Sequence, residues 1–197
     1  MLVFWKAGLV LLAVPKTGTQ AYEALLAPQA DVSMRHPPAL KHMTAQKFRR
    51  QFLPMLGDNV PKLQTVAVIR EPLDWLGSWY RYRSRSQLDG HPNSTAGVSF
   101  EAFVEAYLQA SPPEFARVGA QARFVSNGQG KVLVDHLFAF ERPLGLRAFL
   151  SERLDREIPA PAPTNVSPRK ELSLPDALKA RLQAERAADF ALHASLM

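Results

Sequence analysis

The sequence contains no cysteine, which excludes disulfide bonds, thiolate metal ligands and cysteine nucleophiles in one step. The absence fits a reducing compartment, and we expect a cytoplasmic protein. The five histidines do not occur at the HxxxH or HExxH spacing that holds zinc on one face of a helix. We therefore expect no metal.

The sequence also lacks an apolar run long enough to cross a bilayer, which takes about 20 residues. The N-terminal stretch 1–14 is apolar, but Lys6 interrupts it. Pro15 and Lys16 follow it in place of the small residues of a signal-peptide cleavage site. We interpret this stretch as a buried strand and expect no membrane span.

What the chain does contain is the material for one globular domain, which we expect to span residues 1–197. An apolar fraction of 47% and a charged fraction of 21% are ordinary for a folded domain of this length. The net charge of +6 indicates an anionic partner, such as a nucleic acid, a membrane surface or a polyanionic small molecule. Only the positions of the basic residues can distinguish these partners.

Three apolar runs, at 8–14, 65–69 and 132–140, are each followed by a loop and a helical pattern. This order predicts an α/β fold of three layers with a central, mostly parallel sheet and functional loops at the carboxyl ends of the strands. Segments 31–39, 87–97 and 158–167 are expected to be irregular. Helices are expected at 19–26, at 45–56 after a Thr44 cap, from Pro72, from the Ser99 cap to about 108, at 144–153 and at 175–196.

The loop after the first run reads Pro-Lys-Thr-Gly-Thr-Gln, at residues 15–20. Backbone N–H groups at the start of the following helix favour an anion, Gly18 allows close approach, and Lys16 adds positive charge. Thr17 and Thr19 add hydroxyl groups. The lysine precedes the glycine, so the loop does not fit the GxxxxGK[ST] pattern of ATPases. The alternative is an ordinary strand-to-helix turn with a lysine in it by chance.

The second run ends at Arg70, and Ser78 lies about two turns into the helix that follows. An arginine fork and a hydroxyl together suit a phosphate monoester. The alternative is that Arg70 pairs with Glu71 or Asp74 and that Ser78 is a small packing residue.

Together, the two motifs resemble the two halves of the nucleotide site in the sulfotransferase superfamily, most closely its bacterial and carbohydrate-type members. These enzymes use 3′-phosphoadenosine-5′-phosphosulfate (PAPS) and release 3′,5′-ADP. Segments 135–150 and 165–170 are also similar to family regions. Gln20 replaces the usual hydroxyl residue, but an amide can still donate a hydrogen bond. The resemblance implies that Arg70 and Ser78 bind the 3′-phosphate and that the 5′-phosphosulfate is held by Lys16, Thr17, Gly18, Thr19 and Gln20.

The resemblance also implies a transfer mechanism. Lys16 would contact the leaving-group oxygen, and a base would accept the proton of the acceptor. His42 is the first candidate for that base, His36 the second, and Glu23 on the first helix a weaker one. The alternative for His42 is a capping or surface residue, because geometry decides which group acts as a base. Arg169 and Lys170 would close over the nucleotide.

Residues 81–85 alternate arginine with Tyr82 and Ser84, a pattern that fits the rim of the cosubstrate site, an acidic acceptor groove or a solvated helix face. Trp75 and Trp79 are expected in the core. The function predicted is sulfuryl transfer to a hydroxyl or amine of a carbohydrate or small metabolite. The alternatives are a catalytically silent PAPS- or nucleotide-binding module and, less favoured, a basic nucleic-acid-binding protein.

Overall fold

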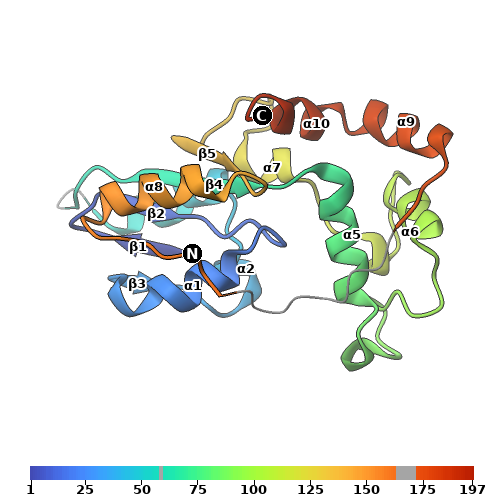
Figure 1. Cartoon of the computed structure of the whole chain (residues 1–197), viewed down its shortest axis with the longest axis horizontal. Helices are drawn as coiled ribbons and strands as arrows, with labels where there is room; N and C mark the ends of the chain where they lie inside the picture. The colour runs from blue at the N-terminus through green and yellow to red at the C-terminus, as the bar shows by residue number, and fades with distance from the viewer. Residues whose placement is uncertain (58–59, 163–171) are drawn as a thin grey trace.

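The computed structural model describes residues 1–57, 60–162 and 172–197 of the chain. It is a mixed α/β fold built on one five-stranded sheet, with the strand order β3-β1-β2-β4-β5 (Figure 1). The strands are β1 (Leu2–Phe4), β2 (Leu9–Leu11), β3 (Val32–Ser33), β4 (Gln64–Ile69) and β5 (His136–Ala139).

The sheet is only partly parallel, so the prediction of a mostly parallel sheet is too strong. β2, β4 and β5 pair in parallel, whereas β1 is antiparallel to both β2 and β3. The difference arises because residues 1–14 form a hairpin instead of one strand. Its turn ends at Gly8, which has a φ of 58° and donates a backbone hydrogen bond to the Trp5 carbonyl (3.0 Å). Both arms of the hairpin are equally apolar, so their pattern did not reveal the turn.

Alternate residues of each strand pack on opposite faces of the sheet, as the two-residue period of a strand requires. On one face, Val10 and Ile69 pack with Phe48 and Phe124, which belong to a π-helical turn (Phe48–Phe52) and to α7 (Gln121–Val125). The other face packs against α1 (Thr19–Leu26) and α8 (Pro143–Arg153). Helices therefore cover both faces.

A third hydrophobic cluster lies beside the sheet, at the right of Figure 1, where α5 (Pro72–Arg83), α6 (Phe100–Tyr107) and α9 (Asp176–Glu185) meet. Trp75, Phe103 and Leu182 are buried at its centre. The Ser99 cap is confirmed, because its hydroxyl oxygen accepts a hydrogen bond from the Ala102 backbone N–H (3.1 Å). The predicted core position of Trp75 is confirmed as well.

Several other helix boundaries differ from the predictions. The Thr44 cap is confirmed by a hydrogen bond from the Lys47 backbone N–H (3.3 Å), but the predicted helix 45–56 consists of α3 (Ala45–Lys47), the π-helical turn and α4 (Leu53–Met55). The predicted helix 175–196 is broken at Arg186 into α9 and α10 (Ala187–Ala194). The supposedly irregular segment 31–39 contains β3 and the start of α2 (Pro38–Lys41), where proline is tolerated at the first helical position.

Within the described ranges, no helix has both the length and the hydropathy needed to cross a membrane.

Candidate functional site

The loop between β2 and α1 has an unusual backbone. Lys16 and Gly18 both have positive φ values, of 66° and 72°. A lysine in this conformation is strained by roughly 1–2 kcal/mol, and such strain concentrates at functional sites. The Thr17 side chain is buried within the loop and its hydroxyl donates to the Val14 carbonyl (2.9 Å). Any contribution of Thr17 to anion binding must therefore come from its backbone N–H.

Gly18 caps the N-terminus of α1, where the first N–H groups have no acceptor within the helix. A Cβ atom at this position would lie 3.0 Å from Cε2 of Phe140, at the end of β5. Glycine is therefore required both by its backbone conformation and by the close approach of the ring. Thr19 is half-buried, while Gly18 and Gln20 are exposed and leave this end of α1 accessible.

The structure brings Arg70 to the same loop. Arg70 follows β4, and its Nη1 atom donates to the Lys16 carbonyl at 3.4 Å. Its Nε atom donates to Asp74 Oδ2 (2.6 Å), Nη2 contacts the same carboxylate, and the guanidinium stacks 4.5 Å from the Phe140 ring centroid. Arg70 thus pairs with Asp74, as the structural interpretation of the motif expected, and also reaches the Lys16 loop, as the ligand-binding interpretation expected.

Trp75, like Arg70, contacts the loop between β2 and α1. Its indole Nε1–H donates to the Pro15 carbonyl (2.8 Å). Two consecutive carbonyls of the loop, of Pro15 and Lys16, are therefore held by side chains from the segment that follows β4. These contacts fix the strained loop against the start of α5.

The Lys16 ammonium lies in an aromatic and strongly cationic environment. Its Nζ atom is 4.2 Å from the ring centroid of Tyr82 and 5.8 Å from that of Trp79. Tyr82 is shared with a second cation, because the guanidinium carbon of Arg85 lies 5.1 Å from the ring centroid. Burial lowers the pKa of Lys16 to about 8, with further lowering by the positive charges of Arg85, Arg70 and Arg81. The cluster therefore favours a bound anion.

Ser78 lies on the face of α5 that carries Asp74 and Arg81, because positions separated by four and seven residues share a helix face. Arg81 Nη2 contacts Asp74 Oδ1 at 3.4 Å. One carboxylate thus holds two arginines, Arg70 and Arg81, beside the half-buried Ser78.

The two histidine candidates for the base have different environments. His42 follows α2, and its ring Nδ1 lies 2.7 Å from the Ala13 carbonyl, just before the Lys16 loop. A carbonyl only accepts, so Nδ1 carries the proton and Nε2 can accept one. Burial lowers the pKa of His42, although the Ala13 hydrogen bond opposes this shift. His36 is exposed in the segment between β3 and α2.

Glu23 is poorly suited to accept a proton. Glu23 is only 6% exposed, and its carboxylate pairs with Arg35 (2.6 Å) and Lys41 (2.8 Å). Burial alone would raise the pKa of Glu23, but hydrogen bonds and charges from Lys41 and Arg35 outweigh it and hold the pKa below its ordinary value. Arg169 and Lys170 lie outside the described residues.

Sequence reasoning missed the groups that support Arg70. The Gln121 amide bonds to both backbone groups of Arg70, at 2.8 Å and 2.7 Å. Glu141, after β5, accepts from the Glu71 backbone N–H (2.8 Å) and contacts His193 (3.0 Å). These contacts join residues 51 or more positions apart, and no local motif indicates them.

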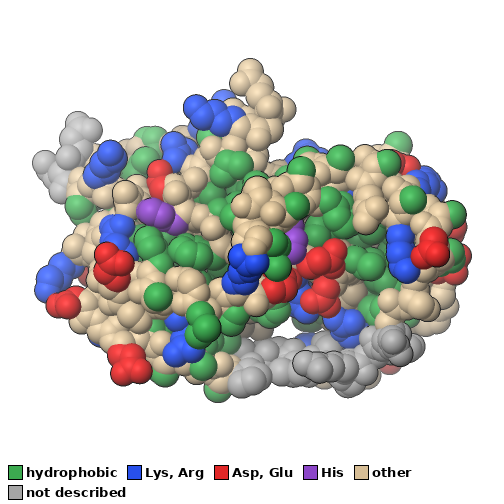
Figure 2. Space-filling model, turned by 45° about the horizontal axis from the view of Figure 1, so that its top comes forward, with side chains coloured by type: hydrophobic (Ala, Val, Ile, Leu, Met, Phe, Trp, Pro, Cys, Tyr) green, Lys and Arg blue, Asp and Glu red, His purple; other side chains and the backbone are tan. Residues whose placement is uncertain are grey.

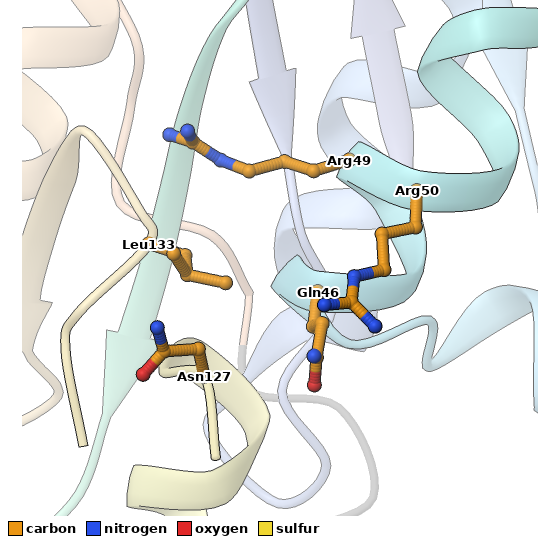
Figure 3. Close-up of a pocket in the computed structure, with 5 residues that line it drawn as sticks. All are labelled: Gln46, Arg49, Arg50, Asn127 and Leu133. Carbon is orange, nitrogen blue, oxygen red and sulfur yellow. The ribbon is translucent and has the colours of Figure 1, made fainter. Parts of the chain in front are cut away.

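A separate basic pocket of about 170 Å³ lies near the amino end of β5 (Figure 3). Figure 3 shows Arg50 and Gln46 side by side on one wall, with Asn127 and Leu133 opposite. Arg49 also lines it and contacts Asp135, directly before β5, at 3.6 Å. The Lys16 loop and Arg70, by contrast, lie at the carboxyl ends of β2 and β4. None of the predicted site residues that the structure describes lines this pocket.

The described residues thus form a mixed α/β fold with a cationic loop between β2 and α1, and they contain no cluster of three potential metal ligands. No family model matches the chain, and neither a curated protein nor a solved structure matches it at a significant level. The case for a function therefore rests on the residues and their geometry.

Proposed function

We propose that the chain is a PAPS-dependent sulfotransferase that transfers a sulfuryl group to a hydroxyl or amine of a carbohydrate or small-metabolite acceptor and releases 3′,5′-ADP. The observation that carries the proposal is the contact between the two predicted motifs, with Arg70 Nη1 3.4 Å from the Lys16 carbonyl. A nucleotide with anionic groups at both ends requires two such cationic elements within its own length.

The Lys16 loop would hold the 5′-phosphosulfate. In the proposed reaction, the acceptor oxygen or nitrogen attacks sulfur, and the bond from sulfur to the bridging phosphate oxygen breaks. That oxygen leaves with the electron pair, so positive charge beside it stabilises the transition state. Lys16 and the N–H groups at the start of α1 provide this charge without rearranging the loop.

The acceptor proton would pass to His42. Its lowered pKa keeps the imidazole neutral at neutral pH, and the Ala13 carbonyl selects the tautomer whose Nε2 can accept a proton. This environment favours His42 over His36, which is exposed, and over Glu23, which two cations already neutralise.

Arg70 and Ser78 would bind the 3′-phosphate. A guanidinium has five N–H donors, and in Arg70 three of them face Asp74 and the Lys16 carbonyl. Among the contacts of the described residues, two donors, one on each terminal nitrogen, remain for a phosphate oxygen. Arg81, on the same face of α5, adds charge to this half of the site.

The test compares 3′,5′-ADP with 5′-AMP by isothermal titration calorimetry. Arg70→Ala should weaken 3′,5′-ADP binding about ten- to hundredfold, because hydrogen bonds to charged groups contribute about 1.5–3 kcal/mol. It should weaken 5′-AMP binding less, because Arg70 acts on the 5′ end only through its contact with the Lys16 carbonyl. Arg50→Gln is the matched control, since it removes a guanidinium from the pocket near the amino end of β5. An equal loss for both nucleotides would contradict the role of Arg70.

Catalysis is tested separately, by 3′,5′-ADP release from PAPS with a panel of sugar and amine acceptors. Release that requires an acceptor and is lost in His42→Gln supports the transferase. Tight binding without release for any acceptor would favour the silent nucleotide-binding module.

A further inference from the structure

Gln121 occupies the place of a strand partner at the end of β4. The β4–β5 ladder ends where Phe140 N–H donates to the Ile69 carbonyl (2.7 Å). At the next residue, the Gln121 side-chain carbonyl accepts from Arg70 N–H (2.8 Å) and its amide NH₂ donates to the Arg70 carbonyl (2.7 Å). Gln121 is only 2% exposed, so water cannot replace either bond. The backbone from which the Arg70 side chain projects is thereby fixed by one amide.

Gln121 is itself held by the C-terminal helix α10. It is the first residue of α7, which has only five residues and no side-chain cap of its own. Asp189 of α10 takes that place, because its Oδ1 accepts from the Ala122 backbone N–H (2.7 Å). Asp189 is 7% exposed, and its carboxylate lies at the positive end of α7. A helix this short depends on such contacts for its position.

A second contact of α10 leads to Glu71, the residue directly after Arg70. His193 is four positions after Asp189 and therefore lies on the same, buried face of α10. Its Nε2 atom is 3.0 Å from Glu141 Oε2, and Glu141 Oε1 accepts from Glu71 N–H (2.8 Å). Asp189 thus reaches the Arg70 backbone through α7 and the Gln121 amide. His193 reaches the Glu71 backbone through the Glu141 side chain.

We propose that α10 positions Arg70 for anion binding through Gln121, making Gln121 and Asp189 positioning residues of the site. Because the Arg70 backbone is fixed, the guanidinium contacts Asp74, Phe140 and the Lys16 carbonyl at the same time. A more mobile Arg70 backbone would therefore weaken the contact with the loop as well as the binding of a ligand. The ligand part of this inference rests on the proposed function, whereas the geometric part does not.

The geometric part is tested without any ligand, by NMR on nitrogen-labelled protein. Two resonances report on the contacts, namely the Arg70 side-chain Nε–H, bonded to Asp74, and the Trp75 indole N–H, bonded to Pro15. Gln121→Met keeps the side-chain length and removes both hydrogen bonds to Arg70. It should speed solvent exchange of the Arg70 Nε–H at least about tenfold and shift the Trp75 signal.

The matched control is Gln109→Met, which makes the same change at an exposed position after α6. It should leave both signals unchanged. Asp189→Ala removes both the charge and the hydrogen-bond acceptor at the start of α7, and should give a change of the same sign. It also provides the decisive measurement if Gln121→Met does not fold. Unchanged Arg70 exchange in a folded variant that lacks the Gln121 or Asp189 contact would overturn the inference.

Calorimetry separates the two proposals. If the wild-type protein binds 3′,5′-ADP, Gln121→Met should weaken it at least about fivefold without a comparable loss for 5′-AMP. If the wild-type protein binds neither nucleotide, the proposed function fails, while the two NMR signals still decide whether α10 positions Arg70.

Discussion

Lys16 combines a strained backbone with an ammonium in a cationic cluster. Both features raise the free energy of the protein without a ligand, and the Pro15 and Lys16 carbonyl contacts keep the loop in this state. An anion at this position would be attracted by Lys16 and the surrounding arginines, and it would meet a loop that needs no rearrangement. This is the electrostatic preorganisation that group-transfer sites require.

The lowered pKa of Lys16 predicts a pH dependence of nucleotide binding. Because its pKa is about 8, the ammonium loses its proton within an accessible range. A bound anion favours the protonated form, so affinity for 3′,5′-ADP should be highest below about pH 8 and should decline toward about pH 9.5. Calorimetry across this range measures the decline.

Lys16→Arg is the control for this profile, because a guanidinium stays charged throughout. Its affinity should be nearly independent of pH over the same range. A profile that declines equally in the wild type and in Lys16→Arg would assign the titration to another group.

At the scale of the elements, the β2–loop–α1 unit depends on Gly18. Gly18→Ala should lower the free energy of unfolding by roughly 1–2 kcal/mol, because alanine is strained in the left-handed backbone conformation. It should lose about 1–3 kcal/mol more because the new Cβ lies 3.0 Å from Phe140. Gly97→Ala isolates the first contribution, since Gly97 has a similar φ of 76° and nothing within 4 Å of a Cβ. Urea denaturation of the two variants gives the difference between their free energies of unfolding. Equal decreases would show that the Phe140 ring moves aside without cost.

The sequence predicted elements best where a local signal was complete. The Ser99 cap sits directly before a helix with apolar residues at helical spacing, and both cap and helix were found. The hairpin at residues 1–14 was missed because both arms are apolar and Lys6 alone marks the turn. The break at Arg186 was missed because the amphipathic pattern continues from α9 into α10. Backbone geometry decides both features, and neither leaves a strong compositional trace.

The same distinction applies to the site. The two motifs follow strands that lie side by side and parallel, so their meeting at one sheet edge could be anticipated from their order. The positions of Gln121, Glu141 and His193 could not, because a buried polar contact across such sequence distances depends on the packing of whole helices. The internal use of the Thr17 hydroxyl is likewise a matter of side-chain direction.

In the whole molecule, the candidate site lies where its two packed parts meet. The Lys16 loop continues from the sheet, whereas Trp75 and Tyr80 belong to the cluster formed by α5, α6 and α9. Trp75 is both a core residue of that cluster and the donor to Pro15. Ligand sites are common at such junctions, where a rigid edge of one layer faces side chains from another.

The distribution of charge leads to the last prediction, which separates a small-nucleotide site from a general affinity for polyanions. Lys and Arg side chains are scattered over the face shown in Figure 2, with acidic side chains between them. Such a surface gives weak binding of a single-stranded oligonucleotide that falls steeply with salt. The loss of oligonucleotide affinity should be similar for Lys16→Ala and Arg50→Gln, because each removes one positive charge.

Binding of 3′,5′-ADP, by contrast, should persist at about 0.15 M salt, and of the two variants only Lys16→Ala should lose it. Fluorescence anisotropy for the oligonucleotide and calorimetry for the nucleotide, each measured against salt, give both profiles. An oligonucleotide that binds tightly at that salt concentration and is unaffected by Lys16→Ala would favour nucleic-acid binding over the transferase, because its phosphates would then be held by basic residues away from the strained loop.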